Sequence, residues 1–359
     1  MKEHDLLKLY DTFLSETKRG KRLQKNRKRV RLSSAVPYVF TGKLLEDFSL
    51  DRNFPLRIRS ITNMKKRELA AEKKYWNKFY LEFTAYLYED LDCYDNYVGA
   101  NIRRLRAFFN YLNEEKEMNI GNFYKRFYAC SEEIEIITLL PEQLNFLIFN
   151  TDFENSLPDY LKRTKDMFVF GCTVALRVSD IFKLTMDNIE VINSRHYLRV
   201  SAQKTGVFTR VLLPDYAVRI IKRQKMKQKT IFGRISNGRY NLNLKELMER
   251  TGWTEARPMM RTKRGIPTPV YKNRKTREQY RFCDLVTSHT MRKTGITTML
   301  CLGMSENAVR KISGHAANSK EFFRYVQLSQ FFMDTEAEKV FEQLKMRVLE
   351  PADIVLESV

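Results

Sequence analysis

The segment TSHTMRKTGITTMLCLGMSENAVRKISGHAANSKEFFRYVQ, residues 287–327, holds the pattern on which the interpretation of this chain depends. Two of the chain's four histidines lie in it: His289 precedes Arg292 by three residues, and His315 precedes Tyr325 by ten. Residues three apart on a helix share a face, so His289 and Arg292 can approach one anion together. A histidine on an apolar helix is just as often a buried core residue, and the rest of the chain has to decide between the two interpretations.

Length and composition limit the class of protein. A chain of 359 residues predicts two or three domains, and a hydrophobic content of 43% is typical of a globular protein. The sequence has no run of about 18 apolar residues and no apolar secretion signal at its start, so we expect neither a membrane span nor export. Five scattered cysteines without a C-x-x-C pair argue against a disulfide framework and a zinc site, and favour a reducing cytoplasm.

The charge of the chain indicates the kind of partner. Lysine and arginine total 64 against 43 acidic residues, a formal net charge of +21. So basic a chain favours a polyanion, because each neutralised phosphate releases condensed counterions. Binding to a membrane surface is the competing interpretation, but the basic residues do not lie on one amphipathic helix with an aromatic face. We therefore expect a nucleic acid as the partner.

Residues 1–130 are expected to form a helical domain. Apolar residues recur at helical spacing from Leu6, and the stretches 68–91 and 96–118 are amphipathic and rich in aromatic residues. Aromatic residues at helical spacing are more often core than base-stacking platforms, and we interpret four of them as core: Trp76, Phe79, Tyr80 and Phe83.

Basic residues of this first domain are candidates for contact with a phosphate backbone. A run of them at 18–31 is typical of a solvated tail or a localisation signal, but its place inside a folded segment favours backbone contact. The candidates in the first domain are Lys21, Arg22, Lys25, Arg27, Lys28, Arg103 and Arg104.

A linker is expected at residues 131–140, followed by a helix with Pro141 in its first turn. A second domain is then predicted over residues 141–334, with a C-terminal helix and tail at 335–359. The predicted fold class is mainly α with a small β-sheet.

Three local patterns stand out in the second domain. Ser179 is predicted to cap a short helix. The segment 196–215 predicts two strands joined by a turn at Lys204. The strongly basic segment 257–282, broken by glycine and prolines, predicts a hairpin or loop against phosphates, with Arg261, Lys263 and Arg264 as candidate contacts.

Single residues of the candidate site are each open to an ordinary explanation. Arg177 can cap a helix end or pair with Asp180, and a lysine at a turn such as Lys204 is common simply because turns are solvated. The ordered set is more specific than any member of it: Arg177, Lys204, His289, Arg292, His315 and Tyr325.

This ordered set supports phosphoryl-transfer chemistry. Two arginines can neutralise the non-bridging oxygens of a phosphodiester. A phenol can attack phosphorus once its proton is removed, and a lysine can protonate the leaving 5′ oxygen. Such a site needs no metal or other cofactor, because guanidinium and imidazole groups supply the positive charge. The sequence contains no HExxH motif and no glycine-rich Walker loop.

The chain resembles the tyrosine recombinase (phage integrase) family. The resemblance rests on ALRVSDIFKL, QKTG followed by TRVLLPD, TSHTMRKTG, ISGHAANSKEFFRYVQ and the basic helical N-terminal half, and is closest to integrases of Bacteroidetes mobile elements. It implies a helical core-binding domain followed by a mixed α/β catalytic domain. It further implies double-stranded DNA with inverted-repeat core sites, a homo-tetramer that passes through a Holliday junction, a possible DNA-bending accessory protein and a bacterial, nucleoid-associated location.

The resemblance also implies a role for each residue. Arg177 and Arg292 would hold the scissile phosphate, Tyr325 would form a 3′-phosphotyrosine, and Lys204 would protonate the 5′ oxygen. His289 would assist proton transfer, His315 would bond a phosphate oxygen, and Asp180 would hold Arg177. The chain departs from the family in one respect, since the tyrosine usually follows the second histidine by nine residues and here follows by ten.

Three other functions stay open at this point. A type IB topoisomerase would use nearly the same chemistry, a relative without catalysis would bind DNA alone, and a basic structural protein could bind RNA. The chain has no RRM-type or KH-type motif for the last.

Overall fold

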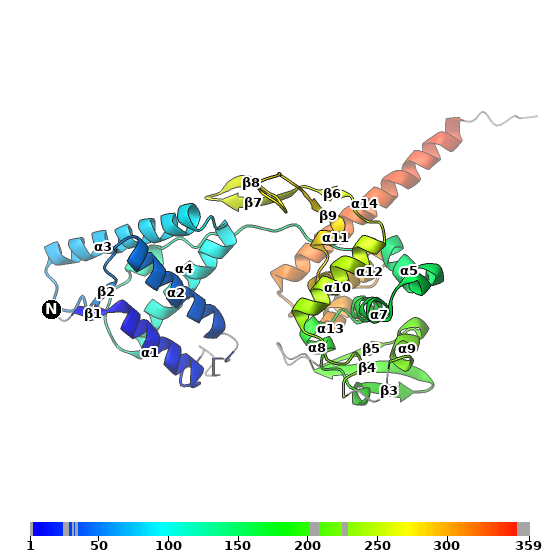
Figure 1. Ribbon diagram of the computed structural model, residues 1–359, viewed down its shortest axis with the longest axis horizontal. Helices are drawn as coiled ribbons and strands as arrows, with labels where there is room; N and C mark the ends of the chain where they lie inside the picture. The colour runs from blue at the N-terminus through cyan, green and yellow to red at the C-terminus, as the bar shows by residue number, and fades with distance from the viewer. Residues whose placement is uncertain are drawn as a thin grey trace, which may run out of the picture. The chain divides into compact units, whose positions relative to one another are not determined.

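The computed structural model describes residues 3–23, 29–30, 32, 35–201, 208–224 and 229–349, with side chains beyond residue 330 described only in part. The chain divides into two compact units (Figure 1). Unit 1 comprises Met1–Ile134 and Pro258–Arg274, and unit 2 comprises Glu135–Arg257 and Lys275–Val359. Mainly helical units with small sheets agree with the predicted fold class.

Unit 1 is built from helices with short β-strands. Strands β1 (Glu3–Asp5) and β2 (Arg57–Arg59) pair antiparallel. The α-helices are α1 (Leu6–Lys18), α2 (Ala35–Asp51), α3 (Lys66–Ala85) and α4 (Asp95–Asn110). One π-helical turn extends α3 and another extends α4, namely η2 (Tyr86–Asp90) and η3 (Tyr111–Glu115), and η4 (Phe123–Arg126) is a 3-10 turn.

Aromatic side chains form the core of unit 1. Trp76, Phe79 and Phe83 are buried, and Tyr80 packs against the same cluster, so the prediction that these aromatic residues are core is confirmed. Phe13 of α1 meets Phe108 of α4 edge to face, with ring centroids 5.5 Å apart. Large aromatic rings in such geometry stabilise a core beyond their buried area.

A hairpin from late in the chain belongs to unit 1. Strands β7 (Met259–Lys263) and β8 (Ile266–Val270), yellow in Figure 1, form the hairpin that the basic segment predicted. Asp95 of α4 accepts hydrogen bonds from the backbone N–H groups of Arg264 (2.8 Å) and Gly265 (2.9 Å) at the turn. The residues predicted as one domain, 141–334, are thus interrupted, because these contacts assign Pro258–Arg274 to unit 1.

Unit 2 begins with four helices, of which α7 is the most deeply buried. They are α5 (Pro141–Phe149), α6 (Thr151–Ser156), α7 (Asp159–Val174) and α8 (Val178–Ile181), followed by the 3-10 turn η5 (Met186–Asn188). Pro141 occupies the first turn of α5, as predicted. The prediction for Ser179 was wrong: α8 is N-capped by Arg177, and Ser179 lies inside the helix. The left-handed backbone of Ala175 (φ 49°) ends α7, and α8 begins three residues later at Val178.

A three-stranded antiparallel sheet follows, in the order β3-β4-β5. Its strands are β3 (Ile189–Ile192), β4 (Arg195–Ser201) and β5 (Phe208–Leu212). The two predicted strands are therefore present and paired, with Leu198 opposite Val211. The turn that carries Lys204 lies outside the described residues.

The remainder of unit 2 contains α9 (Asp215–Lys222), α10 (Asn237–Arg250), the paired strands β6 (Ala256–Arg257) and β9 (Tyr280–Arg281), α11 (Phe282–Leu285), α12 (Ser288–Cys301), α13 (Glu306–Ser313) and α14 (Lys320–Leu349). Helices α9, α10 and α12 pack against α7, and α14 packs against α12. Helix α12 approaches α7 so closely that a Cβ added at Gly295 would lie 2.0 Å from the carbonyl oxygen of Cys172. The helix predicted within residues 335–359 is the end of α14, which continues from Lys320 because no glycine or proline interrupts it. Residues 350–359 lie outside the described residues.

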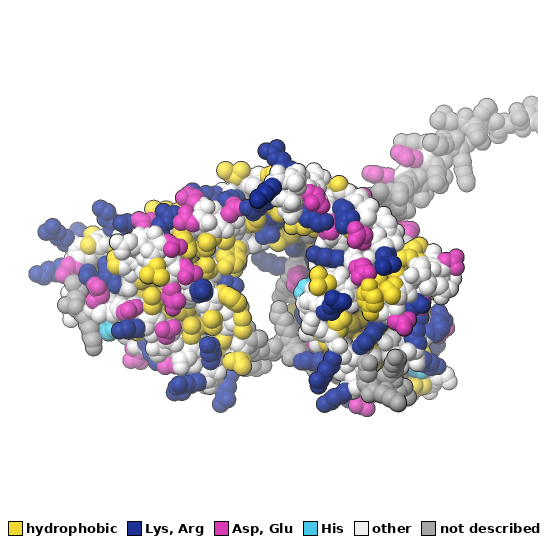
Figure 2. Space-filling model, in the orientation of Figure 1, with side chains coloured by type: hydrophobic (Ala, Val, Ile, Leu, Met, Phe, Trp, Pro, Cys, Tyr) yellow, Lys and Arg dark blue, Asp and Glu magenta, His cyan; other side chains and the backbone are white. Residues whose placement is uncertain are grey.

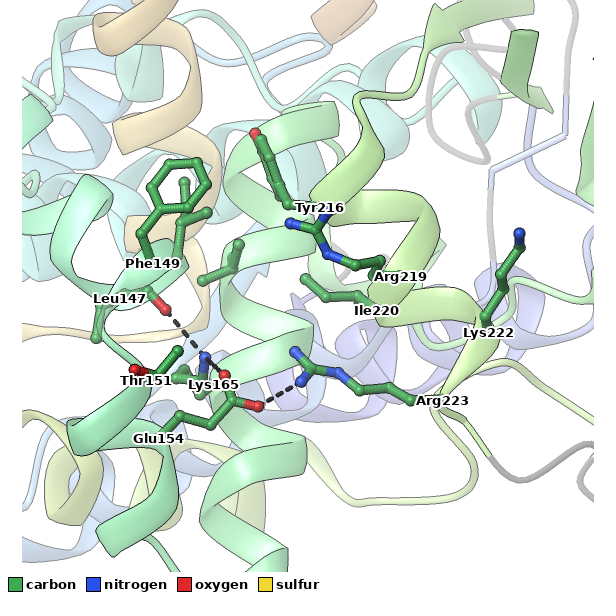
Figure 3. A pocket seen from close by; sticks show the side chains of 12 residues that line it. Leu147, Phe149, Thr151, Glu154, Lys165, Tyr216, Arg219, Ile220, Lys222 and Arg223 are labelled. Carbon is green, nitrogen blue, oxygen red and sulfur yellow. Dashed lines mark hydrogen bonds and ion pairs between the residues drawn. The ribbon is translucent and has the colours of Figure 1, made fainter. Parts of the chain in front are cut away.

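A buried charge cluster fixes the first helices of unit 2 to one another (Figure 3). Lys165 of α7 is 2% exposed and donates to the carbonyl of Leu147 (3.0 Å) and to Glu154 (2.9 Å). Arg223 pairs with Glu154 and with Asp166, and burial raises the pKa of Asp166 to about 6. A pocket of about 530 Å³ lies beside this cluster. Paired on every side, the cluster serves to join α5, α6 and α7 to the end of α9.

Candidate active site

Arg292 is the centre of the candidate site. It lies on α12 with 6% of its surface exposed, and its Nη1 donates to the carbonyl oxygen of Ala175 at 2.9 Å. A left-handed backbone is unfavourable for a residue with a Cβ, so the chain maintains a strained conformation where α7 ends. That conformation aims the Ala175 carbonyl at the guanidinium.

His315 lies on the other side of Arg292. It follows Gly314, whose left-handed backbone (φ 64°) caps α13. Its Nε2 is 3.1 Å from Nη2 of Arg292, and its Nδ1 is 2.8 Å from Oγ of Ser313. Burial, followed by the charges of Arg292 and other arginines, lowers the pKa of His315 to about 3. The imidazole is therefore neutral in the DNA-free protein.

Arg177 brings a second guanidinium to the same place. Its charge helps to lower the pKa of both Arg292 and His315, after the larger effect of burial. The pKa of Arg292 decreases to about 10 in this way. Within the part of the chain that the structure describes, the buried Nη1 of Arg177 has no hydrogen-bond partner. A buried, unpaired donor beside a second cation is costly unless an anion completes the site.

Tyr325 of α14 closes the site from the apolar side. Its side chain is 3% exposed and packs with Ile296, Val309 and Phe322. The centre of its ring is 6.0 Å from that of His315. Burial and then Glu321 raise the pKa of Tyr325, while Arg292, Arg324 and Arg177 oppose the shift. The phenol is protonated in this state and sits among the cations that would favour its ionisation.

The remaining predicted residues are placed less centrally. His289 lies on α12 one turn before Arg292, with part of its surface exposed. Partial burial of the ring, followed by the charges of Lys293 and Arg292, lowers its pKa. Asp180 is buried in the first turn of α8, and its backbone N–H donates to the Arg177 carbonyl at 2.9 Å. Its predicted part in holding the Arg177 side chain stays a prediction. Lys204 lies outside the described residues.

The structure therefore brings four of the six predicted residues together, namely Arg177, Arg292, His315 and Tyr325. The sequence model of the phage integrase family matches residues 150–330, half of the chain.

The chain belongs to the phage integrase family. Phage integrases are tyrosine site-specific recombinases, so the protein is an enzyme of DNA recombination. The narrower resemblance to Bacteroidetes mobile-element integrases stays a prediction. A search of the curated proteins found no match.

Solved structures of phage integrases and related recombinases share the fold. A lambda integrase dimer bound to a COC′ core site matches with a TM-score of 0.54 and 13% identity over 90% of this chain and 77% of that one. The Tn1549 transposon integrase in complex with transposon right end DNA matches with 0.55 and 14% over 90% and 94%. The XerH recombinase bound to a palindromic difH substrate matches with 0.58 and 10% over 94% and 85%.

Several basic residues predicted to contact DNA have structural partners in this integrase. Arg22 is 8% exposed, pairs with Glu115 at 3.3 Å and lies over the ring of Phe13. On the hairpin, Arg261 pairs with Glu132 (2.7 Å), Lys263 with Asp92 (2.6 Å) and Arg264 with Glu89 (2.6 Å). These four side chains make ion pairs within unit 1, and their contact with DNA stays a prediction.

Three of the other candidates for DNA contact lie in the described residues. Lys21 is exposed, Arg103 donates to the Cys130 carbonyl at 3.3 Å, and Arg104 donates to Asn101 at 3.1 Å. Lys25, Arg27 and Lys28 lie outside the described residues. Figure 2 shows many further Lys and Arg side chains over the visible face of each unit, interspersed with Asp and Glu.

Sequence reasoning missed two residues of the site. Ser313 was visible as the first member of Ser-Gly-His, although nothing marked its hydroxyl as a partner of His315. Ala175 gave no signal, because its contribution is a backbone carbonyl in a rare conformation. Across the described residues, no helix is long and apolar enough to cross a membrane, and no group of three possible metal ligands occurs.

Proposed function

We propose that this integrase cleaves and rejoins DNA through Tyr325, with the scissile phosphate held by Arg177 and Arg292. The observation that carries the proposal is the unpaired, buried Nη1 of Arg177 next to Arg292. Guanidinium groups bind phosphate by charge-assisted hydrogen bonds and remain charged even when burial lowers their pKa. An anion bound there would complete a site that now contains excess positive charge.

The proposed reaction is an exchange of phosphate esters. The Tyr325 oxygen bonds to phosphorus, the bond from phosphorus to the 5′ oxygen breaks, and a 3′-phosphotyrosine forms. His289 assists removal of the phenolic proton, His315 bonds a phosphate oxygen, and Lys204 donates a proton to the leaving 5′ oxygen. Attack by another 5′ hydroxyl reverses these steps, so ester energy is retained and no ATP is consumed.

DNA is the proposed partner, in the form of inverted-repeat core sites bound by a homo-tetramer that passes through a Holliday junction. The palindromic difH substrate of XerH and the core-site dimer of lambda integrase support paired protomers on paired sites. An accessory DNA-bending protein and a place on the nucleoid in the bacterial cytoplasm belong to the same proposal. Light scattering of the protein mixed with its site should give four chains per two duplexes, and a stable monomer on DNA would contradict the assembly.

Covalent capture tests the reaction. The protein is expressed in a bacterial host, DNA attached to it is recovered under denaturing conditions, and the attached ends are sequenced. We expect discrete ends with the unmodified protein and with Tyr216→Phe, a control tyrosine of unit 2 that hydrogen-bonds Thr173. We expect none with Tyr325→Phe, which removes only the hydroxyl.

The alternatives predict different outcomes of the same capture. Scattered ends would indicate a topoisomerase-like activity. Absence of covalent DNA from folded, DNA-binding protein would indicate a relative that has lost catalysis, and would contradict the proposal.

A further inference from the structure

Ser313 is the last residue of α13, and its buried hydroxyl lies beside His315. Its Oγ is 2.6 Å from the carbonyl oxygen of Val309, 3.5 Å from that of Arg310 and 2.8 Å from Nδ1 of His315. A carbonyl only accepts, and a hydroxyl has one proton to donate. The short contact takes that proton to Val309, four residues back in the helix, so Oγ is left to accept from the imidazole.

On its other side, the imidazole contacts the Arg292 guanidinium, which can only donate hydrogen bonds. Nη2 of Arg292 is 3.1 Å from Nε2 of His315 and 3.4 Å from Nδ1. A guanidinium has no acceptor, so a proton on Nε2 would set two donors against each other. The Ser313 contact of Nδ1 and the shorter Arg292 contact, that of Nε2, are both satisfied when the neutral ring has its proton on Nδ1. Three hydrogen bonds then run in one direction, from Arg292 through His315 and Ser313 to Val309.

The charged groups around His315 come from three elements. Arg292 belongs to α12, Arg177 precedes α8 and Arg310 belongs to α13, and all three act against a charge on the ring. Helix α14 contributes the rings of Phe322 and Tyr325, with centroids 5.4 Å and 6.0 Å from the imidazole. Without an anion, the ring therefore stays neutral.

A phosphate oxygen between Arg292 and His315 changes what Nε2 must do. The oxygen is an acceptor, and Nε2 in the present tautomer is an acceptor as well. We propose that Ser313 is a positioning residue that holds the His315 proton on Nδ1, so that His315 donates to a DNA phosphate through Nε2 only after it takes up a second proton from solvent. The inference rests on the proposed function, in which this site binds the scissile phosphate.

The proposed state is balanced in charge and in hydrogen bonds. The imidazolium donates from Nδ1 to Ser313 and from Nε2 to the phosphate, so both of its N–H groups have acceptors. Its new positive charge faces the anion that entered. Without the Ser313 hydroxyl, the neutral ring can instead place its single proton on Nε2 and bond the phosphate with no proton uptake.

The tautomer can be measured without any activity. Full-length protein labelled with ¹⁵N-histidine contains four imidazoles, and His315→Gln identifies the signals of His315 in a long-range ¹H–¹⁵N spectrum. We expect a protonated Nδ1 and a bare Nε2 in the DNA-free protein and in Ser313→Thr, which retains the hydroxyl. Ser313→Ala should lose this preference.

A matched control comes from α14. Ser329 is also buried and donates to a carbonyl of its own helix, that of Val326 at 2.8 Å, so Ser329→Ala removes a similar hydroxyl elsewhere. It should leave the His315 spectrum unchanged. A proton on Nε2 in the unmodified protein, or an identical His315 spectrum in Ser313→Ala, would overturn the inference.

Proton uptake tests the consequence for DNA binding. Calorimetry of Tyr325→Phe with a duplex carrying the captured site, in two buffers of different ionisation enthalpy, reports protons taken up without cleavage. We expect uptake with Ser313 present and little with Ser313→Ala added. In the protein that retains Tyr325, Ser313→Ala should also move the alkaline limit of the cleavage rate to higher pH, because phosphate binding then no longer requires a second proton on His315.

The two proposals can fail separately. Equal proton uptake by Tyr325→Phe with and without the Ser313 hydroxyl, while the protein that retains Tyr325 cleaves DNA normally, would overturn the inference alone. Loss of covalent capture would remove the proposed reaction, while the DNA-free spectrum would still decide the tautomer.

Discussion

Arg292 on α12 donates a hydrogen bond of 2.9 Å to the carbonyl oxygen of Ala175, a residue 117 positions earlier in the chain. This bond joins the end of α7 to the helix that carries the centre of the site. Because Arg177 follows Ala175 by two residues, the same junction positions both guanidinium groups. The conformation of Ala175 is therefore a condition for the site.

Ala175 should tolerate glycine and reject valine. Glycine adopts a φ of 49° without strain, whereas a β-branched residue is strongly disfavoured there and would also crowd a fully buried position. We expect Ala175→Gly to stay within about 1 kcal/mol of the unmodified protein and Ala175→Val to lose about 2 kcal/mol or more, measured by urea unfolding. DNA cleavage should decrease for valine only, and equal behaviour of the two variants would contradict this account.

Arg292→Lys should impair catalysis far more than affinity. A lysine can keep the charge but cannot bond the Ala175 carbonyl and a phosphate with a planar fork. We expect cleavage to decrease by about 10²-fold or more, the size of losing one preorganised donor. DNA affinity, measured by gel shift at fixed salt, should change little, because many phosphate contacts contribute to it. Arg281→Lys, at a site paired with Glu249 and Asp284, is the control and should cleave normally.

The stability of the DNA-free protein should depend on the neutral state of His315. Its pKa is lowered from 6.5 to about 3, so the unfolded chain takes up the proton first as the pH falls. This contribution to stability is complete above pH 6.5 and decreases as the pH falls toward 3. His315→Gln should show a weaker loss of urea midpoint between pH 7.5 and 5.

Comparing the pH profiles of the unmodified protein and His315→Gln also removes the effect of Asp166, whose contribution to stability has the opposite pH dependence. Burial raises the pKa of Asp166 to about 6, so its contribution to stability decreases as the pH rises from 3.8 to 6. Asp166 is present in both proteins, and the difference between them isolates His315. Parallel pH profiles would show that His315 is not held neutral by the fold.

Asp95 should hold the hairpin onto α4. Burial acts to raise its pKa, but hydrogen bonds from Tyr88 and from backbone N–H groups at the hairpin turn keep that pKa below 3.8. Asp95→Ala removes the acceptor of the buried Tyr88 hydroxyl and of two N–H groups of the turn, and should cost about 1–3 kcal/mol. Trypsin should then cut at Lys263 or Arg264 faster than in the unmodified protein. Glu246→Gln, which breaks an exposed pair with Arg250 on α10, is the control and should not change the rate of trypsin cleavage. An unchanged cleavage rate in Asp95→Ala would contradict the role of Asp95.

The sequence by itself determined the helical periodicity, the aromatic core and the ordered motif. Apolar residues at helical spacing predicted α1, α3 and α4, because an amphipathic face has to be buried. Local spacing also predicted that His289 and Arg292 share a face of one helix. These features depend on residues a few positions apart in the chain, so the order of residues in the sequence is enough to predict them.

Only the tertiary structure decided which basic side chains have acidic partners within the fold and how the site is held. Arg22 is neutralised by Glu115, 93 residues away, and Arg261 by Glu132, 129 residues away, so composition could not separate them from solvated cations. The tautomer of His315 likewise depends on a hydroxyl whose proton is taken by Val309 and on a guanidinium from another helix. Electrostatic and hydrogen-bonding roles are set by distances across the fold, and periodicity along the chain carries no record of them.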